Sequence, residues 1–185
     1  MKTFITSDLH FDHRGIMGFC PETRPYKDVD HMNSEMIREF NLKVGPNDLT
    51  YFLGDIAFCQ AQKAAGFMRA LNGRKILIQG NHDSKTVKDI SFRSCFEEIH
   101  QYLEINYAGS KICMFHYPIS EWNQCHRGSI HLYGHLHQNA SGLERWRARN
   151  VGFDCTGQVV SLLDDIVVDA LKGEVKKHGD SKSEM

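Results

Sequence analysis

The chain has 185 residues, which is enough for one domain with a sizeable hydrophobic core and leaves little room for a second. Apolar residues make up 41% and charged residues 24%, a globular composition that excludes a disordered chain. The formal net charge is -1, so we expect neither a stable complex with nucleic acid nor binding to an anionic membrane.

Five short runs of β-branched, aliphatic and aromatic residues predict buried strands. In chain order these strands are expected at residues 3–6, 50–53, 75–79, 111–115 and 130–133. Each run is too short for a helix. A further segment, 101–107, precedes the fourth strand across the turn Ala108-Gly109-Ser110, which suggests an antiparallel hairpin.

Amphipathic patterns between and after these strands predict helices. Apolar residues recur at helical spacing over 32–40, and Asp30 is placed to cap the start. A second such pattern covers 61–71. Ser161 would cap a last helix that runs to Leu171.

The alternation of strands and helices predicts a single α/β domain over residues 1–172, with its sheets covered. Residues 173–185 are polar, and we expect them to form a flexible tail. The six cysteines include no Cys-x-x-Cys pair, and no secretory signal or membrane-length apolar run is visible. We therefore expect free thiols and a cytoplasmic protein, whose oligomeric state the sequence does not reveal.

Polar side chains follow the end of each predicted strand. In chain order the motifs are Asp8-Leu9-His10, Gly54-Asp55, Gly80-Asn81-His82-Asp83, His116, and Gly134-His135-Leu136-His137. The carboxyl ends of strands in open α/β sheets are where ligands bind. In three of the five motifs a glycine comes directly before the polar group, which allows a tight turn or a close backbone approach.

The residue types in these motifs indicate a metal centre. The candidate ligands are Asp8, His10, Asp55, Asn81, His116, His135 and His137. A single histidine after a strand is usually a core or capping residue, but five such motifs in series are hard to explain by packing. Carboxylate, amide and imidazole donors without thiolate suit Mn, Fe, Zn, Ni or Co. Seven ligands suit two divalent ions that share a carboxylate, with manganese our first choice, and such a pair would attract and polarise a phosphate.

This series of motifs is similar to that of the calcineurin-like metallophosphoesterase superfamily, and in particular of its small stand-alone bacterial and phage members. The resemblance spans residues 8–137. It implies a four-layer α/β sandwich, in which two mixed β-sheets pack face to face with helices outside.

The resemblance also implies an assignment of ligands. One ion would be held by Asp8, His10, Asp55 and His137. The other ion would be held by Asp55, Asn81, His116 and His135, so that Asp55 bridges the two. His82 would then be the catalytic, non-ligand histidine beside the leaving-group oxygen, to which it donates a proton or a hydrogen bond. Asp83 either orients His82 or is an exposed loop residue.

The activity implied is hydrolysis of phosphate esters. Protein phosphatases of the superfamily follow Gly-Asp with Asp-Arg-Gly, whose arginine grips phosphate, whereas residues 56–59 here read Ile-Ala-Phe-Cys. The missing arginine favours a phosphodiesterase that acts on a nucleotide or another small phosphodiester. A phosphomonoesterase with the same centre is the alternative. A non-catalytic binding scaffold is less favoured, because every motif position is filled.

Several cations lie near the motifs without a fixed role. His13 and Arg14 either contact substrate phosphate or are solvated loop residues. Arg24 is interpreted as a solvated loop cation. The segment Arg145-Trp146-Arg147-Ala148-Arg149 would either stack on a nucleobase and neutralise phosphate or form a polar strand edge.

Overall fold

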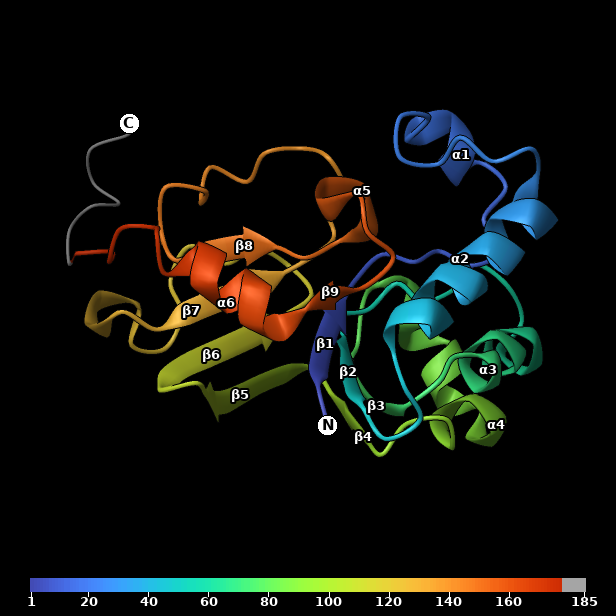
Figure 1. Ribbon diagram of the computed structural model, residues 1–185, viewed down its shortest axis with the longest axis horizontal. Coiled ribbons are helices and arrows are strands. Elements are labelled where there is room, and N and C mark those ends of the chain that lie inside the picture. The colour runs from blue at the N-terminus through green and yellow to red at the C-terminus, as the bar shows by residue number, and fades with distance from the viewer. Residues whose placement is uncertain (178–185) are drawn as a thin grey trace.

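A computed structural model describes residues 1–177, in which nine strands form two sheets (Figure 1). The first sheet has the order β4 (Glu98–His100), β3 (Arg74–Ile78), β2 (Leu49–Phe52), β1 (Thr3–Thr6), β9 (Ser161–Leu162). The second has the order β5 (Tyr102–Tyr107), β6 (Ser110–Phe115), β7 (Ile130–Tyr133), β8 (Ala148–Asn150). All neighbouring strands run parallel except the pairs β1–β9 and β5–β6. The predicted α/β class and its two mixed sheets are confirmed.

The two sheets pack face to face. Successive side chains of a strand point to opposite faces, so one strand contributes to a core on each side of its sheet. Ile5 of β1 lies in the core between the sheets, together with Met114 of β6 and Leu132 of β7. Its neighbour Phe4 points to the other side, into a second core formed with the helices. Cys113 of β6 lies in a third, smaller cluster on the outer face of the second sheet.

The six α-helices within residues 1–177 are α1 (Ile16–Phe19), α2 (Val29–Lys43), α3 (Ala61–Ala70), α4 (Ile90–Arg93), α5 (Phe153–Thr156) and α6 (Leu163–Ala170). Buried residues of α2, α3 and α4 pack on the outer face of the first sheet. The outer face of the second sheet is covered by a loop that carries Trp122 and Cys125. Helix α6 buries Leu163 and Val167 between the sheets, beside β9 and β8 (Figure 1).

Two helix starts differ from their predictions. Helix α2 begins at Val29, and its cap is Asp28, whose carboxylate accepts a hydrogen bond from the His31 N–H at 2.8 Å. Asp30, the predicted cap, lies inside the first turn. Ser161 belongs to strand β9 and pairs with Ile5, so α6 starts only at Leu163. A two-residue strand at a sheet edge carries too little periodicity to be read from sequence.

The end of the described chain packs against the body of the protein. Glu174 forms a β-bridge with Trp146, and Lys176 is buried and pairs with Glu121 at 2.9 Å. Residues 178–185 of the predicted tail lie outside the described residues, so the flexibility of the tail stays a prediction.

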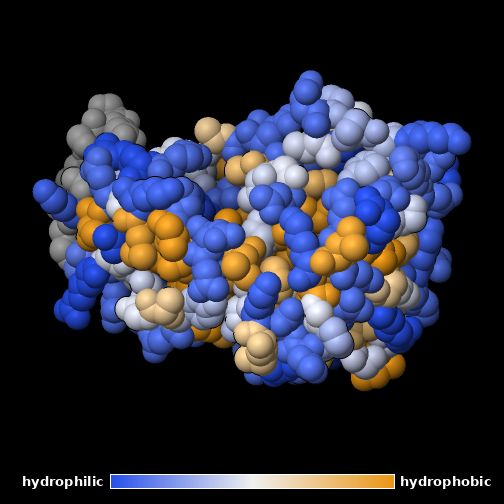
Figure 2. Space-filling view, in the orientation of Figure 1, coloured by the Kyte–Doolittle hydropathy of each residue, from blue (hydrophilic) through white to orange (hydrophobic). Residues whose placement is uncertain are grey.

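The surface of the face shown in Figure 2 is mainly hydrophilic, with hydrophobic side chains over α6 and further ones in the right half of the view. Val168 and Leu171, at this helix, are exposed. None of the helices formed by residues 1–177 combines the length and the apolar character that crossing a bilayer requires.

Candidate metal centre

The carboxyl ends of β1, β2, β3, β6 and β7 meet at one edge of the sandwich. The loops that follow them are tied together by hydrogen bonds. The His10 N–H donates to the Asp55 carbonyl oxygen at 3.0 Å, and the His135 N–H donates to Asp8 Oδ2 at 2.9 Å. His116 Nδ1 lies 2.7 Å from the carbonyl oxygen of Leu53. Motifs that are far apart in the sequence therefore form one site.

The backbone turns sharply at the candidate ligands. Five of the seven have a positive φ: Asp8 (58°), His10 (50°), Asp55 (54°), His135 (71°) and His137 (51°). Non-glycine residues in this left-handed region cost on the order of 1–3 kcal/mol each, and such strain is concentrated at functional sites. The turns bring side chains from five loops to the same edge.

Glycines next to the ligands allow the loops to approach each other. A Cβ added to Gly80 would lie 2.3 Å from Asp55 Oδ1. A Cβ added to Gly134 would lie 2.4 Å from Asp8 Oδ2. Both positions must lack a side chain because a carboxylate occupies that space.

All seven candidate ligands lie at this edge, in two groups. The ligand atoms within each group lie within 4.8 Å of one another; the groups are Asp8, His10 and His137, and Asp55, His116 and His135. Asp55 Oδ2, which belongs to the second group, lies 3.6 Å from His116 Nε2 of that group and 3.7 Å from His10 Nε2 of the first, so it links the two groups. Asn81 Oδ1 lies 2.9 Å from His116 Nε2 and adjoins the second group.

The donor atoms fit divalent cations. Within residues 1–177, Asp8 Oδ1 and both ring nitrogens of His10 are buried without a hydrogen-bond partner, which is costly for polar atoms. The Leu53 carbonyl oxygen can only accept, so His116 Nδ1 carries the hydrogen and His116 Nε2 presents a lone pair. That lone pair faces the Asn81 Oδ1 lone pairs, and two facing acceptors suit a shared cation.

Burial raises the pKa values of the two carboxyl groups and lowers those of three imidazoles, whereas a hydrogen bond to Asp154 raises the pKa of His137. Burial raises the pKa of Asp8 to about 7 and also raises the pKa of Asp55. Burial lowers the pKa values of His10, His116 and His135, which keeps their imidazoles neutral. A bound cation stabilises carboxylates and requires neutral imidazoles. The buried Asp and His clusters can therefore hold metal.

A buried ion pair supports the first group. Arg24 was expected to be a solvated loop cation, and this is wrong: its side chain is buried. It donates to both carboxylate oxygens of Asp154 at 2.7 and 2.9 Å, and to the backbone carbonyl oxygens of Asp8 and Leu9. Arg24 therefore holds the loop that presents Asp8.

Asp154, the acidic partner of Arg24, also contacts the candidate ligand His137. Its Oδ2 lies 2.7 Å from His137 Nδ1, so Nδ1 donates and Nε2 is left free toward the site. Burial alone would raise the pKa of Asp154, but hydrogen bonds from His137 and Arg24 outweigh burial and hold it well below the usual range. Asp154 was not among the residues predicted from sequence. It lies four residues after strand β8, with Phe153 between it and Gly152, so it does not show the glycine-acid pair of the other motifs.

Cys20, His137 and Asp154 also lie within ligand distance of one another. Burial raises the pKa of the Cys20 thiol to about 11, so the thiol stays protonated and is a poor ligand. Because Asp154 is already bound to Arg24, we interpret this group as support for His137.

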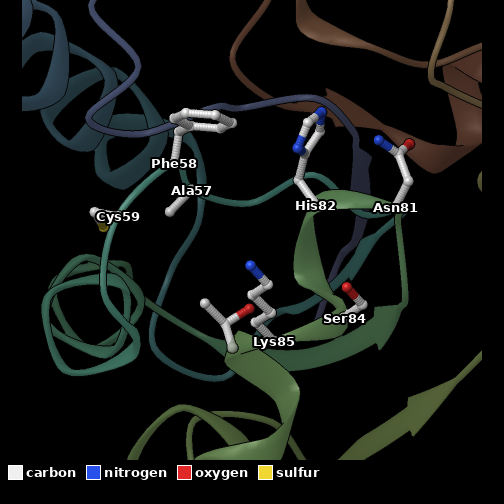
Figure 3. Close-up of a pocket in the computed structure, with 8 residues that line it drawn as sticks. Ala57, Phe58, Cys59, Asn81, His82, Ser84 and Lys85 are labelled. Carbon is white, nitrogen blue, oxygen red and sulfur yellow. The ribbon is translucent and has the colours of Figure 1, made fainter.

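His82 lies beside the two groups and opens to solvent. Its backbone N–H donates to Asp55 Oδ1 at 2.9 Å, and its Nε2 lies 3.9 Å from Asp55 Oδ2. The side chain is 40% exposed and borders a cavity (Figure 3). Both expectations for Asp83 are wrong, because this carboxylate is buried and accepts backbone N–H bonds from Asp55, Ile56 and Gly80.

Of the remaining candidates, His13 and Arg14 lie near the site, whereas the arginines of the segment Arg145–Arg149 make structural contacts elsewhere. The His13 ring lies 5.5 Å from the His10 ring, at the edge of the site, and Arg14 is exposed nearby; contact with substrate stays a prediction for both. Arg149 pairs with Asp169 at 2.6 Å, and Arg147 donates to the Gly128 carbonyl oxygen at 3.1 Å. These contacts support the strand-edge interpretation of the segment Arg145–Arg149.

Two known proteins share sequence with this chain over most of its length. The uncharacterized protein MJ1445 of Methanocaldococcus jannaschii is 34% identical over 140 residues, which are 75% of this chain and 70% of that protein. The gene 66 protein of Mycobacterium phage L5 is 27% identical over 191 residues, covering 86% of this chain and 90% of that protein. No protein-family model matches the chain.

A solved structure of unknown function shares the fold, and two others show a weaker likeness. The protein of unknown function AQ665 from Aquifex aeolicus has a TM-score of 0.70 and 25% identity, over 89% of this chain and 97% of that chain. The nuclease MPE of Pseudomonas putida has a TM-score of 0.46 and 14% identity, over 73% of this chain and 60% of that chain. An archaeal phosphodiesterase has a TM-score of 0.47 and 20% identity, over 76% of each chain. Likeness as weak as the last two says nothing about the activity of this chain.

Proposed function

This chain belongs to the same protein family as MJ1445 of Methanocaldococcus jannaschii, and we propose that it is a phosphoesterase with a dinuclear metal centre. One observation carries the proposal: Asp55 links two groups of buried and half-buried carboxylate and imidazole donors, at the carboxyl edge of the sheets. The seven proposed ligands are Asp8, His10, Asp55, Asn81, His116, His135 and His137. Similarity to calcineurin-like metallophosphoesterases in the order and types of these residues supports this assignment.

Two bound divalent transition-metal ions, manganese first, would supply positive charge to polarise a phosphate ester and lower the pKa of water. Asp55 would hold both ions. Asp154 fixes the tautomer and the ring orientation of His137, as outer carboxylates do for metal-bound histidines. Asp83 holds the backbone of Asp55 and Gly80, so that the two loops keep their spacing.

His82 is the proposed acid. Its backbone is held by Asp55, whereas its ring is partly exposed at the cavity, where a departing oxygen can reach it. The proton moves from the imidazole to that oxygen while the bond between phosphorus and the leaving group breaks. The ring then regains a proton from water.

The proposed substrate is a phosphodiester. Arg24 is committed to Asp154, so it cannot grip a phosphate dianion, and residues 56–59 contain no arginine. His13 and Arg14 lie near the centre and are candidates for contact with a phosphate oxygen. A diester monoanion needs fewer cationic partners than a monoester dianion.

With manganese bound, we expect kcat/KM on bis(p-nitrophenyl) phosphate to exceed that on p-nitrophenyl phosphate by about tenfold, roughly the worth of one charge-assisted hydrogen bond. Steady-state rates on both esters, with metal content measured on the same sample, are the test. A preference for the monoester would overturn the diester assignment. No turnover of either ester by protein that holds two ions would overturn the phosphoesterase.

Replacing His82 by alanine should leave both metal ions bound and reduce the rate. Positioned acid catalysis contributes about 10²–10⁴-fold. The loss should be smallest for nitrophenyl esters, whose leaving group departs without a proton, and largest for alkyl or ribose esters. The measurement is kcat across diesters of graded leaving-group basicity, with His100→Ala, at a half-buried histidine of β4 outside the ligand groups, as a control. A uniform loss, or loss of metal, would contradict the role as acid.

A further inference from the structure

A cavity of about 430 Å³ adjoins the candidate metal centre on the His82 side (Figure 3). It is lined by Ala57, Phe58, Cys59, Asn81, His82, Ser84, Lys85 and Thr86. Its volume lies within the range of small-molecule sites. Two of its lining residues, Asn81 and His82, belong to the proposed centre, so whatever fills the cavity lies next to the reacting phosphorus.

One side of the cavity is an aromatic surface. Phe58 is 52% exposed, which is unusual for a side chain of its size. Its ring packs against the His13 ring at 4.4 Å and lies 5.3 Å from the His82 ring. Its backbone N–H donates to the Phe11 carbonyl oxygen at 2.8 Å, which fixes the loop. An exposed ring held in this way is a ready stacking surface for a planar group.

The opposite side of the cavity carries a cation. Lys85 projects from below toward Phe58 and His82 (Figure 3). No carboxylate is among the lining residues, and within residues 1–177 the Lys85 ammonium has no ion-pair partner. Lys63, close to the same loops, is instead paired with Asp12 at 2.7 Å. The cavity therefore favours an anion.

We propose that this cavity binds the leaving group of the substrate, and that the leaving group is a nucleoside carrying a further phosphate. The inference rests on the proposed phosphoesterase function. The base would stack on Phe58, and the added phosphate would pair with Lys85. In the reaction, water supplies the new oxygen on phosphorus, the bond from phosphorus to the nucleoside oxygen breaks, and that oxygen receives the proton of His82. The substrate is then a small diester that joins two nucleosides, with a terminal phosphate on the departing one.

The first test measures binding and needs no turnover. Isothermal titration of EDTA-treated protein compares thymidine with its 5′- and 3′-monophosphates. In the wild type one of the two phosphates should tighten binding about tenfold. Lys85→Ala should abolish this gain and Lys85→Arg should keep most of it, whereas Lys88→Ala, at an exposed lysine outside the cavity, should leave it intact. Phe58→Leu should weaken thymidine and its phosphates alike, by about five- to tenfold. An equal gain in wild type and Lys85→Ala would overturn the proposal.

The second test uses the manganese-loaded enzyme. The dinucleotide TpT is compared with pTpT and TpTp, since one of these carries its phosphate on the leaving nucleoside whichever ester bond is cleaved. That compound should show about tenfold higher kcat/KM than TpT, and Lys85→Ala should remove the difference. Decathymidylate should be cleaved no faster per linkage than that phosphorylated dinucleotide. Faster cleavage of decathymidylate would overturn the restriction to small substrates.

Bis(p-nitrophenyl) phosphate separates the two ways in which this proposal can fail. Turnover of this ester without any gain from a terminal phosphate would refute the subsite and leave the phosphoesterase standing. Failure to hydrolyse it would refute the phosphoesterase, while the titrations would still decide whether the cavity binds a nucleoside phosphate.

Discussion

Asp55→Asn should lower the content of bound metal from two ions per chain to fewer than one and reduce phosphodiesterase activity by more than about 100-fold. Asp55 Oδ2 lies within 3.7 Å of ring nitrogens from both ligand groups, so a neutral amide at this position weakens both sites together. Even changes to residues that only support metal ligands cost about 10–100-fold in affinity or activity. Elemental analysis of metal-saturated protein, paired with kcat/KM, measures both effects.

Two comparisons make this result specific to the bridge. Asp165→Asn makes the same chemical change at an exposed position of α6 and should retain both ions and full activity. His10→Ala should weaken mainly the group of Asp8 and His137 and leave about one ion bound. If Asp55→Asn still binds two ions, or if the wild type saturates at one, the shared carboxylate is wrong.

Arg24→Ala should destabilise the protein by about 3–5 kcal/mol, because it leaves the Asp154 carboxylate buried without its cationic partner. It also removes the donors that hold the Asp8 and Leu9 carbonyl oxygens, so the loop carrying two candidate ligands loosens. We expect metal affinity to fall about 10–100-fold as a consequence. Urea unfolding of metal-free protein isolates the stability effect, and metal titration measures the affinity.

The matched control is Arg38→Ala, which breaks an ion pair with Glu35 on the exposed side of α2. Such a surface pair contributes about 0–1 kcal/mol, so this variant should unfold almost like the wild type. Arg24→Lys keeps the charge but not the forked geometry that reaches Asp154 and two carbonyl oxygens, and it should fall between the two. An Arg24→Ala variant as stable as Arg38→Ala would show that the buried pair does not hold this loop.

Local patterns in the sequence determined the strands that carry the site. The runs that became β1 and β7 were predicted with their observed ends, and those that became β2, β3 and β6 were displaced by only one residue at one or both ends. A buried strand needs apolar side chains on both faces, so it is visible in the sequence as a run of consecutive apolar residues. The polar motifs at the strand ends, and the glycines before them, are equally local. The positions of the seven candidate ligands could therefore be found without a structure.

Only the tertiary structure decided how residues from separate loops combine. Arg24 and Asp154 are 130 positions apart, and each alone looks like a surface charge; only the fold shows that they form a buried pair behind Asp8 and His137. The carboxylate of Asp83 turned inward because three backbone N–H groups converge on it. The cavity between Phe58 and Lys85 exists because the loops after β2 and β3 stand side by side. Contacts of this kind depend on long-range packing, and no periodicity or spacing in the chain encodes them.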